Sequence, residues 1–464
     1  MATLVMKFGG SLTADPSHIS RVAQVITAES QAWDRLVVVI SAMSGATDRL
    51  SHSVDRAVAH DAAGYRRDVA ALRSEHIATV QALFEDVSLR RDLIAHVDSL
   101  LFDVLAICDS VLTRREASPR DRDAAMAAGE RMMVHIIAAL VRLEGLNPAP
   151  VDATSFIVTD DRHQSAIPLI DIIDERVEKV ILPLLNAGVI PLVTGFIGTT
   201  RTGAVTTLGR GGSDYTATIL AASLHADEVW MWSHVDGVMS ADPEIVPSAR
   251  VIPTLSYSEV GELSYFGAQV IHPRAVEPLL TERIPLRVRN PFNLDHAGTL
   301  IQAEGDEIGT GLKAVTAVDG LALSATGHAV DLGEMLRQVY RLAGRTATGP
   351  VIVIQGNEQS LLVFVVPTSE GPSAAGVAAQ RLTAGLSAEG WTVRVVKVIA
   401  AMGPITSIPL NYSSMGVHPI ASVLGPNARR LIAVDPSQVQ QIVRHLHKLT
   451  NQTPQNASEK WSVQ

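Results

Sequence analysis

The sequence has one cysteine, few aromatic residues and no basic tract, and each scarcity excludes a class of protein. The single cysteine, Cys108, excludes an internal disulfide framework and a cysteine-rich metal site. Aromatic residues make up 4% of the 464 residues, so alanine, valine, leucine and isoleucine must form most of the core. The net charge is -10, which argues against a nucleic-acid partner because such binding depends on neutralising phosphates.

Long apolar runs are also missing. Lys7 and the glycines after it arrive before a signal-type apolar run could form, and no uninterrupted apolar stretch reaches the length of a membrane span. Hydrophobic residues make up 47% and charged residues 19%, which is an ordinary globular composition. We therefore expect a cytoplasmic protein without a membrane partner. We see no metal-ligand spacing of His, Cys and Asp, and expect no metal held by the protein alone.

The first two thirds of the chain alternate between strand and helix signals. An apolar run at 3–8 ends at two glycines, a helix is predicted from Asp15 to about Trp33, and a β-branched run at 36–40 is typical of a strand buried on both faces. Strand-like runs return later, with helical periodicity between them, at 148–151, 189–193 and 228–232. This alternation predicts an α/β fold with a mostly parallel sheet and helices on both faces.

The composition changes near residue 305. Beyond it, strand and helix signals follow the order β-α-β-β and then α-β, which predicts small α+β modules of ferredoxin-like type. A length of 464 residues also predicts two or three domains. We expect a first domain over 1–305, a second region of two modules over 312–450, and a polar, disordered tail over 451–464.

A lysine and two glycines follow the first predicted strand. Lys7 closes the strand, and Gly9, Gly10 and Ser11 come next. Glycines let backbone N–H groups approach a polyphosphate closely, and a lysine adds a charge opposite a transferring phosphoryl group. The same pattern also occurs in ordinary tight turns, so it indicates a phosphate-binding site only together with a second motif.

The second motif is the segment 206–214, in which three glycines fall within four residues just before a predicted helix. The first turn of that helix offers Ser213 and Asp214, an arrangement typical of an anion-binding loop. Arg210, between the glycines, can hold a carboxylate through two parallel hydrogen bonds. The alternative is a solvent-exposed glycine loop with a capping aspartate.

Six short segments together carry a family resemblance. They occur in the same order and at roughly the same spacing as in the aspartate kinase family of the amino acid kinase superfamily, which this chain resembles over residues 4–302. The final third occupies the place of the paired ACT domains of that family but matches them poorly. The segments are KFGGS (7–11), SAMSGATD (41–48), GER (129–131), TTLGRGGSDY (206–215), VDGVMSADP (235–243) and ELSYFGAQVIHPRAV (262–276).

The resemblance implies a role for each matching residue. Lys7 would stabilise the transferring phosphoryl group and Asp214 would organise the lysines around it, while Arg210 would hold the α-carboxylate of aspartate and Glu130 its ammonium group. From the residues alone, Thr47 could instead cap a helix and Glu130 could pair with Arg131. The implied sets are Lys7 and Asp214 for catalysis; Thr47, Glu130, Arg210, Gly211, Gly212 and Ser213 for substrate; and Lys7, Gly9, Gly10, Ser11, Ser233, His234, Met239 and Gln269 for nucleotide.

The nucleotide side departs from the family pattern, whereas the amino-acid side is intact. Loss of one cation that stabilises the transition state commonly costs about 10³-fold, or roughly 4 kcal/mol, in phosphoryl transfer. Arg274 and His234 are candidates for replacement cations. The departures are Ser233-His234 for Thr-Asp, Met239 for Tyr, Glu244 for Arg and Gln269 for Lys.

Three functional hypotheses follow. The first is an enzyme that transfers a phosphoryl group from ATP, with Mg²⁺ brought by the nucleotide, to the side chain of L-aspartate, giving 4-phospho-L-aspartate. The second is a kinase-like protein that binds an acidic amino acid or regulates a partner kinase, and the third is a diverged kinase with another substrate or nucleotide. The resemblance also implies a homo-oligomer formed through the C-terminal modules. The apolar run 351–355 stands where the family has a polar effector-binding strand, so we expect no response to lysine or threonine.

Overall fold

The chain forms two compact units in a computed structural model. The first unit comprises Met1–Gly237, Pro253–Tyr257 and Ile271–Glu304, and the remaining segments form the second. Thus residues 238–252 and 258–270, which precede the expected boundary at 305–312, group with the C-terminal part. The predicted tail at 451–464 lies outside the described residues, which are 1–268, 271–305, 312–326, 332–343, 349–355, 359–367, 373–387, 390–403, 410, 412–413, 416–425 and 429–449.

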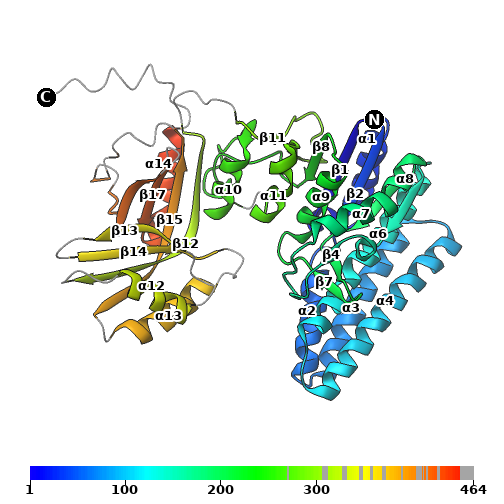
Figure 1. Cartoon of the computed structure of the whole chain (residues 1–464), viewed down its shortest axis with the longest axis horizontal. Helices are drawn as coiled ribbons and strands as arrows, with labels where there is room; N and C mark the ends of the chain where they lie inside the picture. Colours follow the sequence, from blue (N-terminus) through cyan, green and yellow to red (C-terminus); the bar gives the residue numbers. More distant parts are fainter. Residues whose placement is uncertain are drawn as a thin grey trace. The chain divides into compact units, whose positions relative to one another are not determined.

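An eight-stranded sheet forms the centre of the first unit, with the strand order β3-β5-β2-β1-β8-β10-β11-β9 (Figure 1). Only the pairing of β10 with β11 is antiparallel, which confirms the predicted, mostly parallel sheet. The strands are β1 (Thr3–Phe8), β2 (Arg35–Ile40), β3 (Pro148–Val151), β5 (Ile190–Thr194), β8 (Glu228–Trp232), β9 (Thr254–Ser256), β10 (Leu286–Arg289) and β11 (Thr299–Gln302).

Helices cover the sheet. Helices α1 and α6 pack against the face that carries Leu4, Met6 and Phe8, while α9 contacts β1, β2 and β8. The periodic segment between the strand-like runs at 148–151 and 189–193 forms two consecutive helices, because the ring of Pro183 is tolerated only in the first turn of a new helix. The helices are α1 (Pro16–Glu29), α2 (Ala46–Val58), α3 (Ala62–Leu83), α4 (Val87–Arg114), α5 (Pro119–Met126), α6 (Ala128–Leu143), α7 (Ile170–Val180), α8 (Leu182–Asn186), α9 (Gly212–Ser223) and α11 (Pro273–Glu282).

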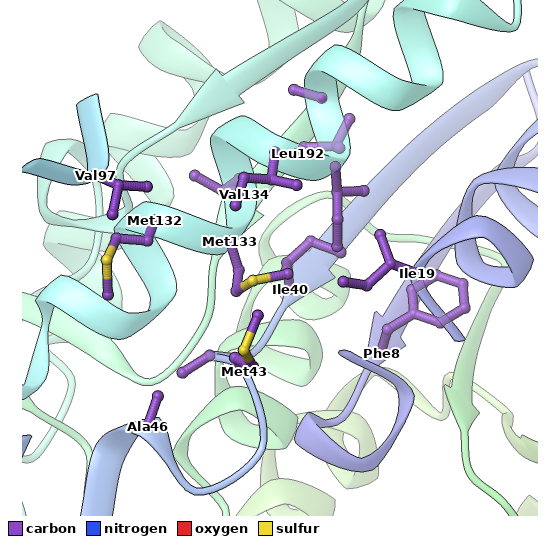
Figure 2. Packing of buried hydrophobic residues seen from close by; sticks show 14 of the residues in the cluster. Phe8, Ile19, Ile40, Met43, Ala46, Val97, Met132, Met133, Val134 and Leu192 are labelled. Atoms are coloured by element: carbon purple, nitrogen blue, oxygen red, sulfur yellow. The ribbon is translucent and has the colours of Figure 1, made fainter. Parts of the chain in front are cut away.

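The main core lies between the sheet and helices α1 and α6. Figure 2 shows Phe8 and Ile40 from the sheet meeting Ile19 of α1 and Met133 of α6. Aliphatic residues dominate this core, as the scarcity of aromatics predicts. Cys108 is buried among them, and burial raises the pKa of its thiol to about 12, as expected of an inert core cysteine.

One helical stretch in the described part of the chain, Pro119–Leu143, passes a length-and-composition test for a membrane span. The apolar window in that stretch is 83% buried inside the protein. A core helix of a globular protein has this property, because its apolar surface already packs against other elements.

The first unit also contains a small sheet of three strands, the last of which precedes α9 in the chain. Its order is β4-β6-β7, where β4 is Val158–Thr159, β6 is Ile197–Thr200 and β7 is Val205–Thr207. Strands β6 and β7 form an antiparallel hairpin, and β7 leads directly into the glycine-rich segment.

The second unit contains a six-stranded antiparallel sheet with the order β13-β14-β12-β15-β17-β16. Helices α12, α13 and α14 pack on one face, and Phe266, just after α10, packs on the other. This α+β arrangement confirms the predicted ACT-type modules. Its elements are α10 (Tyr257–Tyr265), β12 (Ala314–Thr326), α12 (Leu332–Ala343), β13 (Pro350–Gln355), β14 (Gln359–Val365), α13 (Ala374–Leu386), β15 (Trp391–Met402), β16 (Ala421–Gly425), β17 (Arg429–Val434) and α14 (Val439–Lys448).

Candidate functional site

The candidate site forms at the carboxyl ends of three neighbouring parallel strands, β1, β2 and β5. The backbone N–H of Ser41 donates to Phe8 O at the end of β1, and the N–H of Gly195 donates to Ile40 O at the end of β2. The hydroxyl of Thr13 donates to Ala42 O at 2.8 Å, which ties the loop after β1 to the loop after β2. Ligands of open α/β sheets bind at this edge, where loops from adjacent strands meet.

Lys7 and Asp214 form the central ion pair of the site. The Lys7 ammonium lies 2.6 Å from an Asp214 carboxylate oxygen, with the side chains 14% and 20% exposed. Lys7 comes from β1 and Asp214 from the first turn of α9, so residues 207 positions apart in the sequence meet. A Cβ at Gly9 would lie 3.1 Å from the Lys7 Nζ, so glycine there keeps the space beside the ammonium open. The structure therefore brings together the two residues predicted to be catalytic.

The glycine-rich loop turns sharply into α9. Gly211 is the N-cap of this helix at φ +71°, and a Cβ there would lie 2.4 Å from the Cβ of His272. The left-handed backbone and the close approach both require glycine. The cap makes no side-chain hydrogen bond, and Asp214 instead pairs with Lys7, so the alternative of a capping aspartate is wrong. Arg210 is exposed just before this turn.

Glu130 is a buried carboxyl group at the start of α6. Its side chain is 3% exposed, and its Oε2 has no hydrogen-bond partner within the described structure. Burial raises the pKa of Glu130 to about 8, although backbone groups of Glu130 and Ala42 lower it in part. A buried acid with an unused acceptor atom favours an incoming cation such as an ammonium group.

The alternative roles considered for Glu130 and Thr47 are wrong. Arg131 pairs with Asp152 at 2.6 Å rather than with Glu130. Thr47 is the second residue of α2, whose N-cap is Gly45 without a side-chain cap. Both residues lie next to the loop after β2. Glu130 is not the partner of Arg131, and Thr47 does not cap α2.

Two asparagines that the sequence interpretation missed hold the segment after β8. Asp236 accepts hydrogen bonds from the side-chain amides of Asn290 at 2.8 Å and Asn293 at 2.9 Å. The N–H of Ser233 donates to Arg289 O at the end of β10, and His234 is exposed. The sequence signal that could have identified them is a pair of asparagines three residues apart, just after a strand.

The other departures from the family pattern are spread along the chain. Met239 and Glu244 belong to the second compact unit, where Met239 forms a bridge with Val251 and Glu244 is exposed. Gln269 lies outside the described residues. Arg274, a candidate replacement cation, is the second residue of α11.

Acidic residues and histidines near the site do not form a metal cage. In the part of the chain that the structure describes, no group of three or more His, Cys, Asp or Glu side chains is placed to hold a metal ion.

Comparison with known proteins identifies the family and supports the same fold. Residues 2–290 match the model of the amino acid kinase family. The chain is 35% identical over 311 residues to aspartokinase 1, chloroplastic, of Arabidopsis thaliana, covering 66% of this chain and 52% of that protein. It is 30% identical over 375 residues to bifunctional aspartokinase/homoserine dehydrogenase 1 of the same plant, covering 79% and 40%. The chain thus spans about half or less of the length of these curated relatives.

A solved structure shares the fold over nearly the whole chain. Aspartokinase III of E. coli, in complex with aspartate and ADP, superposes with a TM-score of 0.78 at 24% identity, covering 97% of this chain and all of that one. This likeness confirms the predicted α/β fold with C-terminal ACT-type modules. Together with the family match over residues 2–290, it leads to one conclusion: the chain belongs to the amino acid kinase family.

Proposed function

We propose that this protein is an aspartate kinase, which transfers the γ-phosphoryl group of Mg-ATP to the side-chain carboxylate of L-aspartate. The observation that carries the proposal is the Lys7–Asp214 ion pair of 2.6 Å at the carboxyl edge of the sheet. The aspartokinases of Arabidopsis and the E. coli enzyme with aspartate and ADP support it as relatives.

The acceptor side of the site fits an acidic amino acid. Arg210 offers a planar cation for the α-carboxylate, and Glu130 offers a buried acceptor for the ammonium group. The amides at the N-terminus of α9, near Ser213, attract further negative charge. We place Thr47, Gly211 and Gly212 beside these groups as parts of the same substrate pocket.

The donor side fits a polyphosphate. Lys7, Gly9, Gly10 and Ser11 follow one another at the end of β1, where the open space at Gly9 lets phosphate oxygens approach the Lys7 ammonium. Strand β8 pairs with β1, and Ser233 and His234, which follow β8, would also contact the nucleotide. Mg²⁺ bridging the phosphates would neutralise part of their charge.

The reaction needs no general base. The side-chain carboxylate of aspartate is ionised at neutral pH and attacks the γ-phosphorus directly. The bond from phosphorus to the β–γ bridging oxygen breaks, ADP leaves with that electron pair, and the product is the mixed anhydride 4-phospho-L-aspartate. Lys7 stabilises the charge on the transferring group, and Asp214 fixes the ammonium in place.

The test is the formation of ADP that depends on L-aspartate. We expect the full chain to produce ADP with L-aspartate and Mg-ATP, and Lys7→Met to reduce kcat by about 10³-fold, as loss of such a cation commonly does. Lys179→Ala, which removes an exposed lysine of α7, is the matched control and should keep full activity. Aspartate binding without any turnover would instead support a kinase-like binding protein.

We further propose that the protein acts in the cytoplasm as a homo-oligomer joined through the C-terminal modules. Both edge strands of the six-stranded sheet expose apolar side chains, Val353 and Ile354 on β13 and Leu424 on β16. Light scattering should give a mass above that of one chain, whereas a monomer at micromolar concentration would contradict the proposal.

A further inference from the structure

A buried aspartate outside the predicted site is saturated with hydrogen bonds. Asp123 lies on α5, and its side chain is fully buried. Its carboxylate accepts from the Thr207 hydroxyl at 2.7 Å, from the His163 Nδ1 at 2.7 Å and from the backbone N–H of Gln164 at 3.0 and 3.1 Å. Three separate segments of the chain therefore meet at one carboxylate.

These donors surround the start of the glycine-rich loop. Thr207 ends β7, two residues before Gly209, and its carbonyl accepts from the N–H of Ala166 at 3.0 Å. A Cβ on Gly209 would lie 3.0 Å from the Gln164 carbonyl oxygen, so the backbone at 164 packs directly against the loop. Gln164 has φ +69°, which is unfavourable for a residue with a side chain, and its N–H is held by both oxygens of Asp123.

The burial of Asp123 makes its hydrogen bonds costly to lose. Burial raises the pKa of this carboxyl group, while the bonds from Thr207, His163 and Gln164 lower it. Removal of the carboxylate would leave the buried Thr207 hydroxyl and the partly buried donors of His163 and Gln164 without this acceptor. The segment at 163–166 and the end of β7 would then lose their common anchor.

We propose that Asp123 is a positioning residue for the acceptor substrate: it fixes the glycine-rich loop, and through the loop it places Arg210 for the α-carboxylate. The inference rests on the proposed function, since it assigns Arg210 to the acceptor. Asp123 also precedes Glu130 by seven residues, in the helix before α6. One short stretch of chain thus supports both the carboxylate side and the ammonium side of the same ligand.

Kinetics of the full chain separate positioning from general damage. We expect Asp123→Ala to raise KM for L-aspartate by about tenfold or more, a loss of roughly 1.4 kcal/mol in binding, while KM for Mg-ATP changes by less than about twofold. Asp123→Asn should lie between Asp123→Ala and wild type, because an amide oxygen still accepts from Thr207 and its N–H₂ can face His163 in the other tautomer. This conservative variant also serves if the alanine variant fails to fold.

The matched control is Asp121→Asn on the same helix. Asp121 belongs to the capping box of α5 with Ser118 and pairs with Arg114, and neither partner belongs to the glycine-rich loop. This change tests whether a weaker α5 alone alters the kinetics, and we expect both KM values to stay at the wild-type level. Equal increases in both KM values for Asp123→Ala, or the same effect from Asp121→Asn, would overturn the proposal.

Amide hydrogen exchange tests the positioning without any substrate. We expect residues 205–213 of the full chain to exchange faster in Asp123→Ala than in wild type or Asp121→Asn. If wild type does not phosphorylate aspartate, the proposed function fails, while the exchange result still decides whether Asp123 fixes the loop. Unchanged exchange over 205–213 in Asp123→Ala would contradict the inference even in an active kinase.

Discussion

Glu130 illustrates at the scale of single residues how burial creates a binding group. In the free protein, burial holds the pKa of Glu130 at about 8, so the side chain is mostly neutral at pH 7. An ammonium group placed against its unpaired Oε2 would favour the charged form and lower that pKa. Binding of aspartate should therefore be coupled to the loss of a proton.

The first prediction is that L-aspartate binding at pH 7 releases nearly one proton per site. Calorimetric titrations in two buffers with different ionisation enthalpies measure this number directly. Glu130→Gln should bind more weakly and release no proton, because the amide does not titrate. Binding with no proton release in the wild-type protein would show that Glu130 does not meet the ammonium group.

The second prediction concerns Arg210. Arg210→Ala should weaken L-aspartate binding by about 2–3 kcal/mol, or roughly 30- to 150-fold, because it removes charge-assisted hydrogen bonds to a carboxylate. Arg201→Ala, an exposed arginine in the hairpin between β6 and β7, is the control with the same change of charge. Equal affinities for the two variants would refute the role of Arg210.

At the scale of elements, apolar runs predicted β1, β2, β3, β5 and β8, and the structure confirms them. Three strands, β9, β10 and β11, were missed. Each has three or four residues that mix polar with apolar side chains, so no apolar run marks them and tertiary pairing decides their state. The Asp123 anchor was missed for a related reason: its partners come from two separate segments, 163–164 and 207, that only the fold brings to α5.

The third prediction concerns the segments that carry the nucleotide-side departures. Gln269→Lys and Glu244→Arg together should raise kcat or lower KM for Mg-ATP, because they restore positive charge in segments that resemble the nucleotide side of the family. Steady-state kinetics of the double variant against wild type measure the effect. A fast wild type that the two changes slow would show that this protein binds its nucleotide in another way.

At the scale of the whole molecule, the sequence predicted the fold of each unit, but not which residues before 305 belong to the second unit. Motif order and strand alternation gave the α/β sheet and the ACT-type modules. The grouping of residues 238–252 and 258–270 with the second unit was not predictable, because it depends on packing such as that of Ala241 and Val246 with α14. Phe266 likewise packs against β12 and β15, which lie more than 45 residues later in the chain.

The fourth prediction is that lysine and threonine do not regulate this protein. β13 is apolar at 351–354, where an effector-binding strand would be polar, and such a strand supports a sheet without offering side-chain hydrogen bonds to an amino acid. Neither amino acid at about millimolar concentration should move the thermal midpoint, although a ligand at 100 times its Kd stabilises by about 2.7 kcal/mol. An upward shift with either, lost on deletion of residues 312–464, would establish feedback control.

The central claim is that the side-chain carboxylate of L-aspartate accepts the phosphoryl group. Following one oxygen atom of that carboxylate tests this claim most directly. L-Aspartate labelled with heavy oxygen in its side-chain carboxylate is incubated with the protein and Mg-ATP, and hydroxylamine traps the acyl phosphate by attack at the carbonyl carbon. If the carboxylate attacks the γ-phosphorus, the released inorganic phosphate carries one heavy oxygen per molecule, and Lys7→Met slows its formation by about 10³-fold. Phosphate that carries only ordinary oxygen would mean that water, not aspartate, accepts the phosphoryl group, and would contradict the proposed activity.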